Sequence, residues 1–429
     1  MRLPRYPDYK SSGVDWIGRV PDHWKVQPLK RGYAIVGGST PKSDVPAYWD
    51  GDIDWVTPAD LSKLSGFEIR GSLRRITEAG LDSCGTSLVP PGSLILSTRA
   101  PIGSLGLATS HVCTNQGCKA LVPRAEQRAR FVAYALSIAG AALNVRGRGT
   151  TFLELPGDEL GSFPIALPEV SEQDAVIAFL DRETDRIDAL IAEQEKLLAL
   201  LVEKRQATIS HAVTRGLDPN VPMKDSGIAW LGEVPAHWQV GPIKRYVEIL
   251  DGRRVPLSAE ERSYRPGDFP YYGASGIIDS IDDYLFDEDL VLVSEDGANL
   301  LNRSSPIAFV ARGRYWVNNH AHILRPVDGL VDFWAARIEQ LDLAPVVTGS
   351  AQPKLTIEAL ANLLVAVPPS ALERQSIGCY LEQHDRRISE LESSAEKVIH
   401  LLKERRGALI SAAVTGQIDV RGLIEADAA

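Results

Sequence analysis

Residues 15–31 read DWIGRVPDHWKVQPLKR, and residues 229–245 repeat this text as AWLGEVPAHWQVGPIKR. Ten of the 17 positions are identical at a constant offset of 214, and they include both tryptophans of each copy. Segments 172–218 and 373–419 form a second repeated pair, with 18 identities in 47 positions at an offset of 201. The longer stretches between the repeats hardly resemble each other. A repeated frame around two different inserts predicts two related domains about an internal pseudo-twofold axis.

The second repeated pair has the pattern of two long helices. Apolar residues recur at spacings of three and four, the 3.5-residue period of a coiled-coil seam, and charged residues flank them. We expect the two helices to pack antiparallel on each other, with the flanking domains at opposite ends. The predicted seam consists of Leu180, Ile187, Leu190, Leu197, Leu201, Leu381, Ile388, Leu391, Val398 and Leu402.

The two inserts combine short β-like runs with Gly- and Pro-rich turns and a few helical patches, so each is interpreted as one α/β domain. The predicted fold class is α+β, with two α/β domains joined by the antiparallel helix pair. The predicted boundaries are a first domain at 1–167, a central helix at 168–218, a second domain at 219–367, and a distal helix with the C-terminal tail at 368–429.

Composition is that of a globular protein, with 44% hydrophobic and 24% charged residues. No apolar run has the roughly 18–20 residues needed to cross a bilayer, and the N-terminus lacks the apolar core of a signal peptide. We therefore expect a cytoplasmic protein with no membrane partner. The net charge is −10, but residues 1–167 carry +4 and residues 219–367 carry −7. This acidity argues against strong nonspecific DNA binding by the chain alone, and favours a partner that supplies phosphate contacts.

Several enzyme signatures are absent from the sequence. There is no GxxxxGK[ST] phosphate loop and no Asn/Asp-Pro-Pro-aromatic tetrapeptide of the kind that amino-methyltransferases use. PGDEL at 156–160 lacks the lysine that a nuclease carboxylate pair requires. His320 and His322 form an HxH pattern in a strand-like context without a third ligand, which favours a structural role over metal binding. We therefore expect no catalytic residue, no metal and no cofactor in this chain.

Several motifs resemble those of one family, the specificity subunit of type I restriction–modification systems. The repeated text at 15–31 and 229–245 and both helix ends, ATISHAVTRGLD and ALISAAVTGQID, belong to this resemblance. One departure is the first helix entry, PEVSEQDAV, where the family usually shows Pro-Pro followed by Glu-Gln. The other matching motifs are LSTRAPIG (96–103), TNQGCKAL (114–121), YYGASGIID (271–279), SEDGANL (294–300), WVNNHAHILRP (316–326) and GSAQPKL (349–355).

The resemblance implies a DNA-binding function divided between two target-recognition domains. Each domain would recognise one half of a split double-stranded DNA target, and the helix pair would fix the gap between the halves. The resemblance also implies two adenine-methyltransferase subunits and additional restriction subunits as partners. S-adenosylmethionine, ATP and Mg²⁺ would then be bound by those partners.

Base recognition needs side chains with paired donors and acceptors on exposed loops, such as Arg for guanine and Asn or Gln for adenine. For each candidate, a turn-capping or solvated role is an equal alternative. The predicted DNA contacts are Arg99, Asn115, Gln116, Arg146 and Arg148 in the first domain, and Asn299, Arg303, Asn318, Asn319, His320, Gln352 and Lys354 in the second.

The repeated tryptophans Trp16, Trp24, Trp230 and Trp238 lie in the shared frame and not in the inserts. We therefore expect them to pack a common structural element or a partner, in preference to stacking on bases. The repeated cations Arg205 and Arg406 near the helix ends fit either a solvated face or a docking surface.

Two alternative functions remain open. One is the recognition half of a fused methyltransferase–nuclease that has lost its catalytic part, but the complete second helix argues against it. The other is a stand-alone DNA-binding regulator, which the acidic charge balance opposes. The sequence does not give the DNA target, because specificity also depends on loop geometry and DNA shape.

Overall fold

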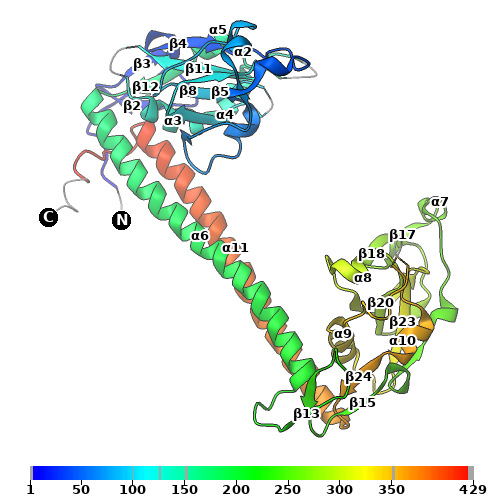
Figure 1. The fold of residues 1–429 in the computed structure, drawn as a ribbon. Coiled ribbons are helices and arrows are strands. Elements are labelled where there is room, and N and C mark those ends of the chain that lie inside the picture. The colour runs from blue at the N-terminus through cyan, green and yellow to red at the C-terminus, as the bar shows by residue number, and fades with distance from the viewer. Residues whose placement is uncertain (1–2, 100, 125–126, 150–152, 350–352, 424–429) are drawn as a thin grey trace. The chain divides into compact units, whose positions relative to one another are not determined.

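The computed structural model describes residues 3–99, 101–124, 127–149, 153–349 and 353–423 (Figure 1). The chain divides into two compact units: unit 1 contains residues 1–194 and 397–429, and unit 2 contains residues 195–396. Two long helices, α6 (Val170–Arg215) and α11 (Ala371–Val414), each contribute to both units. Each unit therefore combines one α/β domain with the first part of one long helix and the last part of the other.

Unit 1 is built on a five-stranded sheet in the order β4-β11-β8-β9-β6. Its pairs are antiparallel except for the parallel edge pair β6–β9. Helix α3 (Ala129–Ser137) packs on this sheet through a continuous buried run from Phe131 to Leu136. The strands are β4 (Tyr33–Gly37), β6 (Glu68–Ile69), β8 (Leu94–Ser97), β9 (Leu105–Ala108) and β11 (Cys118–Pro123).

Unit 2 repeats this arrangement with the four strands β16-β23-β20-β21, all antiparallel. Helix α9 (Val331–Glu339) takes the place of α3 against the sheet. The strands are β16 (Val247–Ile249), β20 (Leu290–Ser294), β21 (Ala308–Ala311) and β23 (Ala321–Pro326). The prediction of one α/β domain in each insert is therefore confirmed, and the two domains share one strand order.

A second sheet in each unit contains an equivalent parallel pair. In unit 1 the order is β10-β5-β7, and in unit 2 it is β18-β17-β22-β19. The pairs β5–β10 and β17–β22 are both parallel. The strands are β5 (Trp49–Val56), β7 (Arg75–Ile76) and β10 (Val112–Thr114), and β17 (Pro266–Gly273), β18 (Gly276–Ile281), β19 (Phe286–Asp287) and β22 (Arg314–Val317).

The repeated text of the sequence contributes one strand to each of two small strand pairs in each unit. Short helices connect the larger elements. The strand pairs are β1 (Tyr9–Ser11) with β2 (Arg19–Pro21), β3 (Lys25–Pro28) with β12 (Pro164–Leu167), β13 (Met223–Asp225) with β14 (Glu233–Pro235), and β15 (Gln239–Pro242) with β24 (Leu364–Val367). The short helices are α1 (Pro58–Leu61), α2 (Glu78–Asp82), α4 (Gly140–Val145), α5 (Gly157–Ser162), α7 (Ala259–Ser263), α8 (Asn299–Asn302) and α10 (Ile357–Asn362).

The repeated Trp-His text holds the beginning of each long helix on its domain. Trp24 is fully buried, and its Nε1 donates to Glu172 Oε1 at 3.0 Å, while His23 Nε2 lies 2.8 Å from Glu172 Oε2. In unit 2, Trp238 and His237 make the same contacts with Glu373, each at 3.0 Å. A carboxylate in the first turn also interacts favourably with the positive end of the helix. The prediction that the repeated Trp24 and Trp238 pack a common structural element is confirmed.

The two long helices run antiparallel. In unit 1, Arg406 Nε of α11 lies 2.9 Å from Asp188 Oδ1 of α6. In unit 2, the Arg205 guanidinium makes two 3.0 Å hydrogen bonds to the Glu392 carboxylate. An early position of one helix therefore faces a late position of the other in both units. Arg205 and Arg406 occupy equivalent positions of the repeat, and both pair with the opposite helix.

The phase of the seam differs from the prediction. The inward positions of α6 include Ile187, Ile191, Gln194, Leu198 and Leu201, at alternating spacings of four and three. Six predicted residues are buried or half-buried, namely Leu180, Ile187, Leu201, Leu381, Ile388 and Leu402. The other four must be corrected, because their side chains are between 38% and 48% exposed: Leu190, Leu197, Leu391 and Val398.

The cause of this error is visible in the sequence. Leu190 and Ile191 are adjacent apolar residues, so apolarity alone fits a seam through either of them. In α11 the equivalent inward position is Glu392, and the next is the small Ala395, neither of which a search for large apolar residues selects.

Across the helices that the structure describes, none is long and apolar enough to cross a bilayer.

The last turns of each long helix close the core of the domain on which the other long helix begins. Ile410, Ala413 and Val414 of α11 belong to the core of unit 1 together with Trp24. Ala212 and Val213 of α6 belong to the core of unit 2 together with Trp238. The nearly identical texts ISHAVT and ISAAVT therefore have the same packing function in the two units.

Candidate nucleic-acid interface

Backbone hydrogen bonds in unit 1 bring four segments together at the end of β8 and the start of β11. Thr98 N donates to Gly117 O, and Leu155 N donates to Thr98 O, both at 2.8 Å. Arg148 and Glu154 exchange two backbone bonds of 2.8 and 2.9 Å. We call residues 98–99, 115–117, 146–149 and 153–155 the first loop cluster. It contains five predicted DNA contacts: Arg99, Asn115, Gln116, Arg146 and Arg148.

Unit 2 has an equivalent arrangement, the second loop cluster, at residues 295–297, 318–320, 347–349 and 353–355. Glu295 N donates to His320 O at 2.9 Å, and Leu355 N donates to Glu295 O at 2.8 Å. Thr348 and Lys354 exchange two backbone bonds of 2.9 and 2.7 Å. This cluster contains four predicted contacts: Asn318, Asn319, His320 and Lys354. A fifth, Gln352, lies outside the described residues.

Arg99 and Arg148 are the exposed cations of the first loop cluster. Arg99 Nε lies 3.0 Å from Glu154 Oε2, and the Arg99 side chain is 46% exposed. Arg148 pairs with Glu159 and remains 64% exposed. Exposed ion pairs stabilise a fold weakly, so these guanidinium groups can exchange a carboxylate for a phosphate or a base edge at small cost.

The other predicted residues of the first loop cluster have local partners. Asn115 Oδ1 accepts a hydrogen bond from Gly117 N at 3.0 Å, which is a turn. Exposed Gln116 accepts a hydrogen bond from the Thr40 hydroxyl. Arg146 donates to Ser162 Oγ at 3.3 Å and lies over the Phe163 ring. Among these three, Gln116 is the residue that the structure places at the surface.

The second loop cluster combines one buried amide with exposed polar groups. Asn318 is 6% exposed, and its Oδ1 accepts from His320 N at 2.8 Å, which repeats the turn at Asn115. His320 Nδ1 lies 2.8 Å from Asp296 Oδ2, and Lys354 Nζ lies 3.1 Å from Glu295 Oε1. Asn319 is exposed, and none of the described residues forms a hydrogen bond with its side chain.

Asn299 and Arg303, also predicted contacts, hold α8 in place. Asn299 Nδ2 donates to Ser305 O, and its Oδ1 accepts from Ser305 N, both at 2.9 Å. Arg303 has a left-handed backbone with φ +52°, and its guanidinium donates to the carbonyls of Glu339, at 2.7 Å, and Leu341. Their side chains are therefore engaged with the protein.

The two loop clusters reverse the charges at one equivalent pair of positions. Arg99 and Glu154 form a backbone bridge in unit 1, and Asp296 and Lys354 form the matching bridge in unit 2. The cation and the acidic residue have therefore exchanged places on the same backbone frame. A surface with the same geometry and the opposite charge order presents different hydrogen-bond donors and acceptors to a ligand.

A buried ion network under the second loop cluster was missed by sequence reasoning. Arg254 Nη1 donates to Glu295 Oε2 at 2.5 Å and to Ala321 O at 2.8 Å. His322 is fully buried; its Nδ1 lies 2.6 Å from Asp251 Oδ2, and its Nε2 donates to the Leu355 carbonyl at 2.8 Å. Arg254 is 41 residues from Glu295 and 67 from Ala321, so no local pattern reveals the network.

The cations of the network offset the cost of burying its carboxylates. Burial by itself raises the pKa of Glu295, but hydrogen bonds from Arg254 and Lys354 outweigh burial and hold that pKa below its ordinary value. Ligand atoms of Asp251, Glu295 and His322 lie within 4.8 Å of one another, which is a spacing that a metal ion can bridge. However, both ring nitrogens of His322 already have partners, and Arg254 supplies positive charge to both carboxylates. The described geometry is therefore that of an ion network.

The fold defines a class of protein in which two related α/β domains are joined by an antiparallel pair of long helices. The family model of the type I restriction modification DNA specificity domain matches residues 21–199 and 235–400. These matches cover most of the chain and include both units. The chain belongs to this family.

Similar proteins match over nearly the whole length. The type I restriction enzyme MjaIX specificity subunit of Methanocaldococcus jannaschii is 24% identical, covering 95% of this chain and 96% of the relative. The EcoprrI specificity subunit of Escherichia coli is 23% identical, covering 87% and 91%.

Two solved structures share the fold. A chain from a study of the assembly and conformational transition of a type I R-M system has a TM-score of 0.69 and 15% identity, covering 92% of this chain and 98% of its own. The HsdS subunit from Thermoanaerobacter tengcongensis has a TM-score of 0.54 and 16% identity, covering 93% and 98%.

Proposed function

We propose that this chain directs a type I restriction–modification complex to a bipartite, asymmetric double-stranded DNA target. Each loop cluster would recognise one half of that target. The observation that carries the proposal is the pair of equivalent clusters with exchanged charges, Arg99 and Glu154 against Asp296 and Lys354. One backbone frame with two sets of side chains favours two related recognition sites with different base preferences.

The proposal includes two methyltransferase subunits and additional restriction subunits as partners. Two copies of the repeated frame offer two equivalent surfaces, which is the arrangement that a pair of identical subunits requires. The acidic second domain favours partners that add phosphate contacts. S-adenosylmethionine, ATP and Mg²⁺ would be bound by these partners, and this chain would contribute recognition without catalysis.

Genome-wide mapping of methylated adenines tests the proposal. The chain is co-expressed with its methyltransferase, and the purified chain alone, supplied with DNA and S-adenosylmethionine, is the control. We expect a two-part, non-palindromic motif with a fixed gap in the first case and no methyl transfer in the second. Replacing residues 32–160 by the segment of another family member should change only one half. A continuous motif, a swap that alters both halves, or methylation by the chain alone would contradict the proposal.

A further inference from the structure

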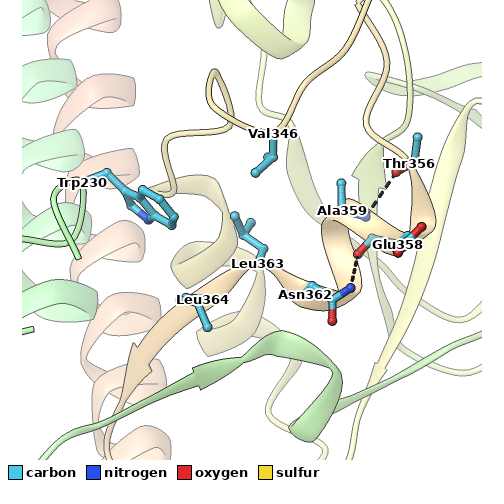
Figure 2. Close-up of a pocket in the computed structure, with 8 residues that line it drawn as sticks. All are labelled: Trp230, Val346, Thr356, Glu358, Ala359, Asn362, Leu363 and Leu364. Atoms are coloured by element: carbon cyan, nitrogen blue, oxygen red, sulfur yellow. Dashed lines mark hydrogen bonds between the residues drawn. The ribbon is translucent and has the colours of Figure 1, made fainter. Parts of the chain in front are cut away.

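Unit 2 contains a hollow of about 400 Å³ in front of Trp230 (Figure 2). Its wall is mainly apolar and includes Val346, Ala359 and Leu363. Figure 2 shows the Trp230 ring directed toward Leu363 and Val346. Trp230 is 39% exposed, whereas Trp238 of the same repeated text is fully buried. A large exposed indole beside an apolar hollow is a typical feature of an interaction site.

The equivalent place in unit 1 is filled by side chains of the chain itself. Trp16 stacks on Phe163 with ring centroids 5.4 Å apart and an interplanar angle of 23°. The Arg146 guanidinium lies over the Phe163 ring, 5.2 Å from its centroid. Glu159, which also pairs with Arg148, lies 3.8 Å from Arg146. Unit 1 therefore contains a complete stack of indole, phenyl ring and guanidinium.

Three substitutions between the repeats explain why the place is open in unit 2. Helices α5 and α10 align at an offset of 200, so Val346, Ala359 and Leu363 stand where unit 1 has Arg146, Glu159 and Phe163. Each replacement is smaller, and together they remove the ring, the cation and its counter-ion. Trp230 retains the position of Trp16, but no aromatic ring among the described residues stacks on it.

The Asn362 amide and the Thr356 hydroxyl of the hollow are already engaged. Asn362 Nδ2 donates to the Glu358 carbonyl at 2.9 Å, and its Oδ1 accepts from Lys244 at 2.7 Å. Thr356 Oγ1 accepts from Ala359 N at 3.1 Å. The wall consequently offers little specific recognition to a polar ligand. It offers an indole face and aliphatic surface.

We propose that the hollow in front of Trp230 binds an uncharged aromatic side chain, Phe or Tyr, of a partner protein. The incoming ring would stack on Trp230 as Phe163 stacks on Trp16. An arginine is the less suitable occupant, because Glu159, the carboxylate beside Arg146 in unit 1, is replaced by Ala359 in unit 2. Stacked aromatic pairs are stabilised beyond the effect of the area they bury. This inference does not depend on which DNA sequence the chain recognises.

Binding is tested on the purified full chain with N-acetyl-phenylalaninamide, using N-acetyl-leucinamide and N-acetyl-argininamide as matched probes. The indole N–H signals are followed by NMR, and those of Trp230 and Trp16 are assigned from Trp230→Phe and Trp16→Phe. We expect the phenylalanine probe to shift the Trp230 signal saturably, more strongly than the leucine or arginine probe. The Trp16 signal should remain unchanged.

A second variant separates filling of the hollow from damage to the fold. Leu363→Phe supplies the missing ring from within the chain, so it should abolish the response to the probe while preserving or raising the Tm. Unaltered probe binding in Leu363→Phe, or a stronger response to the arginine probe, would overturn the proposal. The same holds if Trp230 does not respond to the phenylalanine probe. Because DNA methylation is not part of this measurement, a negative result leaves the proposed function unaffected.

Discussion

At the scale of single residues, Glu172 connects the repeated text to the long helix that follows it. It accepts hydrogen bonds from Trp24 Nε1 at 3.0 Å and from the Tyr6 hydroxyl at 2.5 Å. Burial, together with the bond to Glu172, raises the pKa of Tyr6, so this hydroxyl keeps its proton and donates it. The twin residue Glu373 has the tryptophan and histidine partners, and its side chain is more exposed, 31% against 6%.

We therefore predict that Glu172→Ala destabilises the protein more than Glu373→Ala. The first change leaves two buried donors without a partner, and the second leaves one. Each such donor costs about 1–3 kcal/mol. Chemical denaturation of both variants measures the difference. Tyr6→Phe is the control, because in that background the two substitutions should have nearly equal effects; equal effects in the wild-type background would contradict this explanation.

The network around Glu295 predicts a dependence of stability on pH. The folded-state pKa of Glu295 lies below its ordinary value of 4.5, so folding favours the carboxylate. Its contribution to stability is therefore present at neutral pH and is lost as the pH falls through the depressed pKa. The charged and titratable groups facing it are Arg254, Lys354, His322 and Asp251.

Glu295→Gln should lower stability at neutral pH and flatten its decline in acid. Denaturation of the wild type and the variant across the acidic range checks both effects. Glu288→Gln is a suitable comparison, since the Arg325 hydrogen bond also lowers the pKa of that more exposed carboxylate. If the stability difference between wild type and Glu295→Gln does not shrink as the pH falls, the network does not stabilise the fold in this way.

At the scale of elements, the phase of the coiled-coil seam determines which leucines hold the helices together. Ile191 is 8% exposed, whereas its neighbour Leu190 is 48% exposed. Charged groups also lie in the interface, where Arg205 pairs with Glu392. The seam is therefore defined by the fit of facing side chains as well as by apolarity.

Ile191→Asp and Leu190→Asp form a matched pair that tests this phase. The first places a carboxylate in the buried seam and should destabilise the protein by more than about 3 kcal/mol. The second changes an exposed position and should alter stability by no more than about 0.5 kcal/mol. Thermal unfolding of the isolated chain measures both. A larger loss of stability from Leu190→Asp than from Ile191→Asp would contradict this phase and support the seam predicted from the sequence.

At the scale of the whole molecule, the continuous helices α6 and α11 are elements of both units. We propose that this helix pair sets the length of the gap between the two half-sites, as the family resemblance implies. Because the seam repeats every seven residues, one heptad can be removed from both helices without changing which side chains face inward. The pairs Asp188–Arg406 and Arg205–Glu392 identify the levels at which the helices face each other.

We predict that deleting residues 193–199 together with 395–401 shortens the gap and leaves both half-sites unchanged. Seven residues of helix are about 10.5 Å long, which corresponds to about three base pairs. Methylation mapping of the complex measures the gap. Deletion of 193–199 alone misaligns the seam and should abolish methylation. An unchanged gap in the double deletion would show that the helix pair does not set it.

The sequence by itself determined the internal repeat, the two α/β domains and the helix pair, because identical text and heptad periodicity are local signals. The sequence also placed Arg99, Gln116 and Lys354 on loops, and the structure has all three residues exposed there. Their contact with DNA is decided by neither and remains a prediction.

Only the tertiary structure decided features that depend on residues far apart in the chain. These are the seam phase at Ile191, the common strand order of two dissimilar inserts, the ion network of Arg254 and the hollow at Trp230. The engaged side chains of Asn299 and Arg303 belong to the same group, since their partners Ser305 and Glu339 become neighbours only on folding. The physical reason is that burial and pairing are properties of packed surfaces, and one segment of sequence does not specify the surface it will meet.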